Sequence, residues 1–111
     1  MFFGSCFDKD DAVDVEPNQL WGLWVKGNSQ EYWRYRSDNT GVTWDEADDV
    51  SEDESNLTYE WSVEKGIITH VFRGEQGNQQ VPKTYTIVAW SDNQMKWRDV
   101  YGFTTTLNKV E

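Results

Sequence analysis

The sequence predicts an all-β fold, an antiparallel up-and-down barrel of eight strands. After residue 18 the chain divides into eight short runs, most with a tryptophan or tyrosine on an alternating face, and Gly, Asn and Asp turns separate them. The 7 Trp, 5 Tyr and 5 Phe, together with many Thr and Val residues, favour strands over helices. The connections are short, so each run is expected to pair with its neighbour in the sequence.

The first four runs alternate in a way that assigns their faces. They span residues 20–25, 31–37, 42–44 and 56–63. The first run is apolar on both faces, as expected of a strand that is covered on both sides. In the second run Trp33 and Tyr35 share a face, and in the third Val42 and Trp44 do. The alternation of the fourth run predicts four inward side chains, Leu57, Tyr59, Trp61 and Val63.

The last four runs span residues 67–73, 81–90, 94–99 and 103–110. Lys65-Gly66 predicts a tight hairpin turn before the first of them, because glycine supplies a positive φ. The side chains predicted to face inward or to share a face are Tyr85, Ile87, Met95, Trp97, Phe103, Thr105 and Leu107. Eight such strands close into a barrel that side chains fill or that holds one small ligand. A two-layer sandwich would need the long crossovers that this chain lacks.

Length and charge exclude several classes of partner. A chain of 111 residues forms one domain with a sufficient core. The net charge of −10 repels phosphate backbones, so we expect no nucleic-acid partner. Anionic lipid headgroups would be repelled as well, so attachment to a membrane needs an anchor. The sequence contains no apolar stretch long enough to span a bilayer, and we expect a monomer.

The single cysteine, Cys6, stands in a motif that suggests such an anchor. Phe3-Gly4-Ser5-Cys6 resembles the lipobox that ends bacterial lipoprotein signals, and departs from it at Phe3, where leucine is usual. Met1 is interpreted as a start residue added where the signal was removed. The resemblance implies acylation of Cys6, which anchors a protein by burying methylene groups in the bilayer. The alternative is a fortuitous cysteine in a disordered acidic segment.

The residues after Cys6 extend this resemblance. Phe7-Asp8-Lys9-Asp10-Asp11 resembles the signal that directs some lipoproteins of Gram-negative bacteria to the surface of the outer membrane. Residues 7–18 have no apolar period and carry many like charges, which predicts a solvated spacer. The expected organisation is therefore a lipobox remnant and disordered tether over 1–18, followed by a barrel over 19–111.

A second resemblance concerns the barrel itself. Eight strands with Gly22-Leu23-Trp24 on the first are similar to the lipocalin-like branch of the calycins, and more closely to small lipocalin-like domains of bacterial lipoproteins. The similarity covers residues 18–110. It implies that Trp24 plugs the closed end of the barrel and that Lys109, in place of the usual arginine, packs against it. The family's helix after the eighth strand has no counterpart before Glu111.

The sequence gives little support for catalysis or metal binding. His70 is the only histidine and lies within a predicted strand, whereas a zinc site needs two or more His or Cys ligands. We therefore interpret His70 as a structural strand residue and expect no enzyme activity, metal or cofactor. The acidic run Asp45–Glu54 lacks the glycine and the spacing of an EF-hand. It is interpreted as a long solvated loop that can present a binding edge at the barrel rim.

The aromatic residues carry the functional hypotheses. The candidate ligand-binding residues are Trp33, Tyr35, Trp44, Tyr59, Trp61 and Trp97. They can line a cup for a small apolar ligand, offer platforms on which sugar rings stack, or simply fill the barrel. The leading expectation is a non-enzymatic, membrane-tethered lipoprotein whose barrel binds a small apolar ligand. The alternative is a glycan- or protein-binding accessory module that uses the barrel surface around a filled interior.

Overall fold

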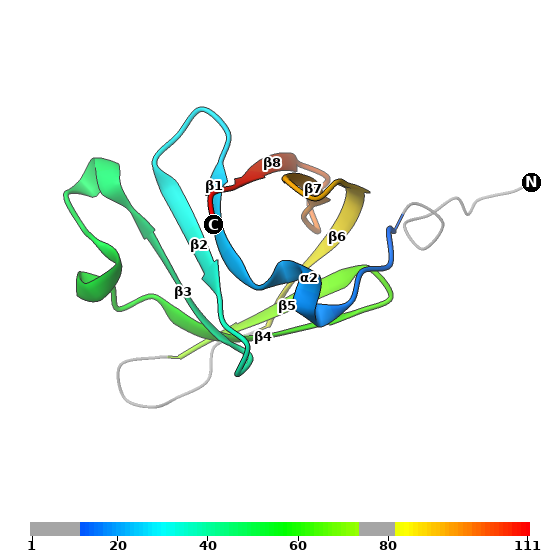
Figure 1. Cartoon of the computed structure of the whole chain (residues 1–111), viewed down its shortest axis with the longest axis horizontal. Coiled ribbons are helices and arrows are strands. Elements are labelled where there is room, and N and C mark those ends of the chain that lie inside the picture. Colours follow the sequence, from blue (N-terminus) through cyan, green and yellow to red (C-terminus); the bar gives the residue numbers. More distant parts are fainter. Residues whose placement is uncertain (1–11, 74–81) are drawn as a thin grey trace, which may run out of the picture.

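The computed structural model describes residues 12–73 and 82–111, which form a closed antiparallel barrel (Figure 1). Its strands are β1 (Gly22–Lys26), β2 (Glu31–Tyr35), β3 (Thr40–Asp45), β4 (Thr58–Glu64), β5 (Ile67–Phe72), β6 (Lys83–Trp90), β7 (Gln94–Arg98) and β8 (Thr104–Lys109). Each strand pairs with the next along the chain, and β8 pairs with β1. The predicted fold class and up-and-down order are confirmed. None of the helices in the described part of the chain is long and apolar enough to cross a membrane.

Closure of the barrel depends on Gly22. Its φ of 129° lies in a region that L-residues with a side chain rarely adopt. A Cβ atom at this position would lie 2.3 Å from the carbonyl oxygen of Glu111. That oxygen accepts a hydrogen bond from the N–H of Leu23, and the N–H of Val110 donates to the oxygen of Leu23 at 2.7 Å. Glycine therefore lets β1 approach the chain end that follows β8.

Two apolar clusters lie on opposite faces of the strands. The larger cluster fills the barrel and contains tryptophan, tyrosine and aliphatic side chains from seven strands. The smaller cluster lies outside, where Leu23, Val42 and Trp44 pack with the half-buried Tyr32 and Val50. The register explains the division, because Trp44 is opposite Tyr32 on β2, whereas the neighbouring Thr43 is opposite the inward Trp33.

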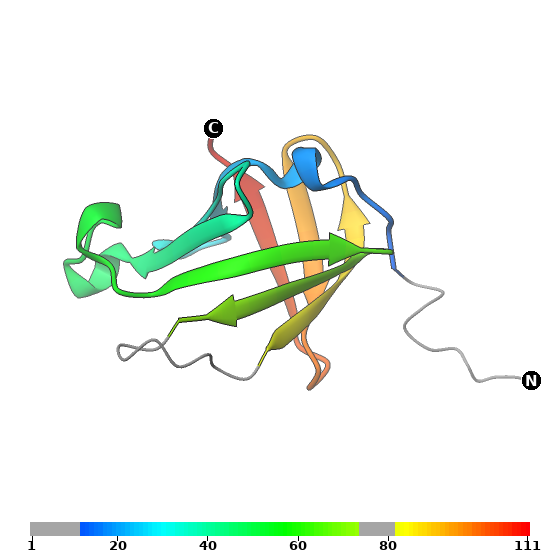
Figure 2. The same cartoon turned by 90° about the horizontal axis from the view of Figure 1, so that it is seen from below.

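The short helix α2 (Pro17–Leu20) lies across one end of the barrel, which we call the closed end (Figure 2). The β7–β8 turn lies at the other, open end. Leu20 at the end of α2 is fully buried in the core. Trp24 is also fully buried, and its Nε1 donates to the oxygen of Leu20 at 3.0 Å. The Nζ of Lys109 lies 5.3 Å from the ring centre of Trp24. This is the arrangement that the Gly-x-Trp resemblance implies.

The prediction that residues 12–18 belong to a solvated spacer is wrong. Val15 is buried in the core, and Val13 packs against the core. The N–H of Val13 donates to the oxygen of Ile87 at 2.8 Å, where the β6–β7 register shifts. Val13 and Val15 are two residues apart and therefore point to the same side of an extended chain. This lets an otherwise acidic segment pack against the barrel. Residues 1–11, including Cys6, lie outside the described residues.

Two residues depart from the predicted alternation, namely Leu57, expected to point inward, and Phe103, expected to share a face with Thr105 and Leu107. Leu57 is 55% exposed and Phe103 is 71% exposed. Both directly precede a strand, since β4 begins at Thr58 and β8 at Thr104. They therefore belong to loops of the open end, where the alternation of the strand no longer sets the direction of a side chain. Val63, the last inward residue predicted on β4, is half-buried.

Replacement of Trp24 by alanine should destabilise the fold by about 3–5 kcal/mol, the range for truncating a buried aromatic residue. Urea unfolding followed by far-UV circular dichroism measures this. Trp21 is the matched control, because it is 44% exposed, and Trp21→Ala should cost about 1 kcal/mol or less. Equal losses in the two variants would contradict the role of Trp24 as a plug.

Candidate functional site

Five of the six predicted ligand-binding aromatics lie together inside the barrel. Trp33, Tyr35, Tyr59, Trp61 and Trp97 are all buried in the larger cluster. Their rings contact one another: the centroids of Trp33 and Trp97 are 5.5 Å apart, and those of Tyr35 and Trp61 are 5.3 Å apart. Such distances are those of packed aromatic pairs. At this level the rings fill the barrel rather than line a cup.

Trp44 does not join this group. It lies on the outer face of β3, where its ring stacks on Tyr32 with centroids 5.3 Å apart. The interpretation that places Trp44 inside the barrel with the other five rings is therefore wrong. The physical reason is the parity of β3: Trp44 is one residue after Thr43, which faces the interior opposite Trp33.

His70 on β5 lies at the centre of the interior rings. It is fully buried, and its Nε2 forms a 2.7 Å hydrogen bond with the hydroxyl of Tyr35. Its ring stacks on Trp33 at 5.1 Å and lies 4.6 Å from Tyr59 and 5.1 Å from Tyr85. Nδ1 has no hydrogen-bond partner among the described residues. A single histidine within a strand does not reveal this position from the sequence. The only signal is that His70 is two residues after Ile68, so both side chains lie on the same face of β5.

The interior is electrically neutral around His70. Burial lowers the pKa of His70 from 6.5 to about 3, and the positive charge of Lys83 adds to this effect. Burial also raises the pKa of Tyr35 and of Tyr59 well above the usual value for a phenol. The hydroxyl of Tyr59 donates to the oxygen of Arg34 at 2.7 Å. The polar groups of the interior thus serve hydrogen bonding between strands and carry no charge at neutral pH.

A hollow of about 580 Å³ opens beside this core, at the open end of the barrel. We call it the mouth hollow. It forms because β3 and β4 pair only where Thr40–Val42 face Thr58–Glu60. Beyond that point a loop with the 3₁₀ helices η2 (Glu46–Asp48) and η3 (Glu52–Glu54) departs from the barrel (Figure 1). The hollow is lined by Glu31, Trp33, Thr43, Trp44, Asp45, Asp48, Val50, Glu54, Ser55, Asn56 and Leu57.

The loop of the mouth hollow is fastened to the barrel. Glu52 accepts two hydrogen bonds from Arg34 on β2, at 3.1 and 3.2 Å. Ser55 donates its hydroxyl to the oxygen of Thr43 at 2.6 Å, and the N–H of Glu46 donates to the oxygen of Gln30 at 3.0 Å. The acidic run predicted as a solvated loop lies at the barrel rim as expected. It is also folded, and its shape is set by contacts with β2 and β3.

Both tryptophans of the mouth hollow are oriented by carboxylates. Nε1 of Trp33 donates to Glu31 at 2.9 Å, and Nε1 of Trp44 donates to Glu46 at 3.2 Å. Since each indole N–H is already bonded, the remaining surface of each ring is apolar or π surface. Trp33 also stacks on His70, so the packed interior holds this ring in place at the border of the hollow.

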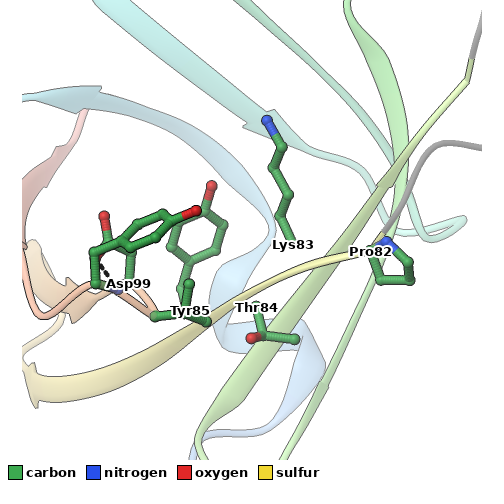
Figure 3. Close-up of a pocket in the computed structure, with 7 residues that line it drawn as sticks. Pro82, Lys83, Thr84, Tyr85 and Asp99 are labelled. Carbon is green, nitrogen blue, oxygen red and sulfur yellow. Dashed lines mark hydrogen bonds between the residues drawn. The ribbon is translucent and has the colours of Figure 1, made fainter.

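A second hollow of about 460 Å³ lies between the start of β6 and the β7–β8 turn, lined in part by Lys83, Tyr85 and Tyr101. Figure 3 shows Lys83 and Tyr85 extending from one side of β6, with Thr84 on the other side. Asp99 fixes the turn, because its Oδ1 accepts the N–H groups of Tyr101 and Phe103 at 2.9 and 3.0 Å. Val100 and Tyr101 on this turn are exposed to solvent, at 72% and 82%.

Within residues 12–73 and 82–111, no group of three or more His, Cys, Asp or Glu side chains is placed to hold a metal ion. The four carboxylates that line the mouth hollow are thus not gathered into such a group. Convergence of several oxygens at 2.3–2.6 Å is what a calcium ion requires.

The buried His70 should make folding stability depend on pH. The unfolded chain binds a proton near pH 6.5 and the folded chain only near pH 3, so protonation favours unfolding in that window. The contribution of neutral His70 to the free energy of unfolding is therefore present above the unfolded-state pKa of 6.5 and is lost as the pH falls below it. Between pH 7 and pH 5 this loss is about 2 kcal/mol. Urea unfolding at both pH values should show that this part of the loss disappears in His70→Gln.

The ring protons of His70 provide a second measurement on the unaltered protein. In an NMR titration their chemical shifts should remain those of a neutral imidazole down to pH 4. A midpoint near 6.5 would contradict the burial that the structure assigns to this side chain.

Comparison of the chain with protein-family models, with curated proteins and with solved structures found no match. The class of the protein therefore rests on its architecture. Eight antiparallel strands in up-and-down order, closed between β1 and β8, form a barrel compatible with a lipocalin-like fold.

Proposed function

We propose that the chain is a non-enzymatic binding module of the lipocalin-like type, and that a small ligand with an apolar part occupies the mouth hollow. The observation that carries this proposal is the hollow itself. Its volume of about 580 Å³ lies within the roughly 300–1,000 Å³ of small-molecule sites. Two tryptophan rings and the side chains of Val50 and Leu57 supply apolar lining, and several polar groups stand among them.

The packed interior supports binding at the mouth rather than deep in the barrel. Trp33, Tyr59, Trp97 and His70 contact one another across the space that a deep ligand would need. Displacing such rings would cost the packing that stabilises the fold. A ligand at the mouth needs no such displacement and can still contact Trp33.

We also propose that the module is tethered to the outer membrane of a Gram-negative bacterium, on the cell surface, through a lipid on Cys6. The support is the resemblance of Phe3-Gly4-Ser5-Cys6 to a lipobox. Ala12 and Val13 lie against Gly66 in the β4–β5 turn, at the closed end. The described residues therefore begin at the closed end, whereas the mouth hollow lies at the open end.

Cys6→Ala should release the protein from the membrane. Expressed with a lipoprotein signal in a Gram-negative host, the unaltered chain should fractionate with membranes and incorporate labelled palmitate. The variant should incorporate none and be recovered in the soluble fraction, because no acyl chain remains to insert. Ser5→Ala is a matched control that retains the acceptor thiol. Membrane attachment that survives in Cys6→Ala would overturn the tether.

Ligand binding at the mouth can be located by the indole N–H signals of ¹⁵N-labelled protein. Titration with 2-phenylethanol and with 1-hexanol should shift the signals of Trp33 and Trp44, which line the hollow. The signals of Trp24 and Trp61 should stay unchanged, because these rings lie away from the hollow. Leu57→Ser should weaken the shifts, whereas Val110→Ser, at an exposed residue of the other end, should not. Shifts at Trp24 and Trp61, or none at millimolar probe, would refute the proposal.

One observation favours a second candidate function, a glycan- or protein-binding surface. The β7–β8 turn exposes Val100, Tyr101 and Phe103 together, and Asp99 accepts hydrogen bonds from two backbone N–H groups of this turn. Exposed apolar side chains on a fixed turn are typical of contact surfaces. A ligand of this surface would shift the amide signals of residues 100–103 and leave the indole signals of Trp33 and Trp44 unchanged.

A further inference from the structure

We infer that the mouth hollow selects a small organic cation, an amine or quaternary ammonium group attached to an apolar body. The inference rests on the proposed function, since it names the class of ligand for the same hollow. Three properties of the hollow carry it: the sign of its charge, the surface of its two tryptophans and the spacing of its carboxylates.

The lining of the hollow is anionic without compensation. It contains Glu31, Asp45, Asp48 and Glu54 and no lysine, arginine or histidine. Within the described part of the chain, none of these four forms a salt bridge. Three of them accept hydrogen bonds from neutral donors, namely the indole of Trp33, the N–H of Ala47 and the N–H of Ser51. Their negative charge therefore remains directed to whatever enters the hollow.

The neighbouring Glu52 differs from these four carboxylates, because it forms salt bridges. Glu52 belongs to the same loop, yet it pairs with Arg34 at 3.1 Å and with Arg36 at 3.7 Å and does not line the hollow. Arg34 and Arg36 are thus paired with Glu52, which fastens the loop to β2. Among the described residues, the charged side chains that line the hollow are all carboxylates.

The tryptophans also favour a positively charged ligand. Trp33 and Trp44 border the hollow, and each has its N–H directed to a carboxylate, Glu31 or Glu46. The face of an indole ring attracts a cation through its quadrupole, most strongly where water is excluded. One face of each ring is already covered, by His70 for Trp33 and by Tyr32 for Trp44. An ammonium group in the hollow would meet the remaining ring surface together with the carboxylates, while its apolar body would contact Val50 and Leu57.

The spacing of the carboxylates separates this ligand from a metal ion. Among the described residues no three acidic, histidine or cysteine side chains are placed to hold a metal. Carboxylates that line a hollow of about 580 Å³ instead provide a diffuse negative field, which an ammonium group carried on an apolar body can use without coordination. The geometry thus points to an organic cation.

The test compares three probes of nearly equal shape that differ in charge: 2-phenylethylammonium, 2-phenylethanol and 3-phenylpropionate. Calorimetric or NMR titration at low ionic strength should give the cation about tenfold tighter binding than the neutral alcohol, and the anion should bind more weakly than both. The advantage of the cation should shrink as sodium chloride is raised from 20 to 500 mM, because exposed charges are screened. The alcohol should show little change.

Two conservative variants identify the carboxylates. Asp48→Asn and Glu31→Gln keep the shape of the side chain, and glutamine retains an oxygen for the indole of Trp33. Each should weaken binding of 2-phenylethylammonium about threefold without affecting 2-phenylethanol. Asp53→Asn is the control, because Asp53 is also an exposed aspartate in a 3₁₀ helix of this loop but does not line the hollow.

The outcomes separate the two proposals. Equal affinity for cation and alcohol, with shifts at Trp33 and Trp44, would overturn the charge selection and leave binding at the mouth in place. Equal effects of Asp48→Asn and Asp53→Asn would overturn it as well, by showing that only the net charge matters. Absence of shifts at Trp33 and Trp44 with all three probes would overturn the proposed function itself.

Discussion

The packing of aromatic rings around the neutral His70 is the interaction on which the rest of the structure depends. Rings from β2, β4, β5, β6 and β7 meet at this imidazole, so one cluster joins five of the eight strands. Each buried aromatic ring removes a large apolar area from water. A chain with few leucines can therefore build a dense core. The hydrogen bond from Tyr35 satisfies one imidazole nitrogen inside that core.

The filled interior also limits where the proposed ligand could bind. A barrel of eight strands has space for side chains or for one small ligand, and here aromatic side chains take the space. The remaining hollow lies where β3 and β4 separate and a loop fastened by Arg34 completes the wall. Because Trp33 belongs to both regions, the rigid core holds one wall of the hollow in a fixed position. A preorganised wall of this kind lowers the cost of binding.

The charge of the molecule differs between the packed interior and the rim at the open end. The interior is neutral, since burial keeps His70 unprotonated and Tyr35 and Tyr59 as phenols. The rim is acidic, and the arginines that could neutralise it are engaged with Glu52 on the side away from the hollow. A net charge of −10 favours solubility by itself. Four of the acidic residues line the hollow beside its two indole rings, and the proposed preference for a cation rests on this arrangement.

The sequence by itself determined the fold class and most of the inward faces, because alternation with period two and short turns leave few ways to pair eight strands. Trp33, Tyr35, Tyr59, Trp61 and Trp97 all face inward as the pattern predicts. Only the tertiary structure placed Trp44 outside, because a short strand between loops does not reveal its parity relative to its neighbours. It also showed that Val13 and Val15 adhere to the barrel, since their binding surface is made by β6, far away in the sequence. The mouth hollow likewise depends on where β3 and β4 separate, a property of strand pairing that no local pattern encodes.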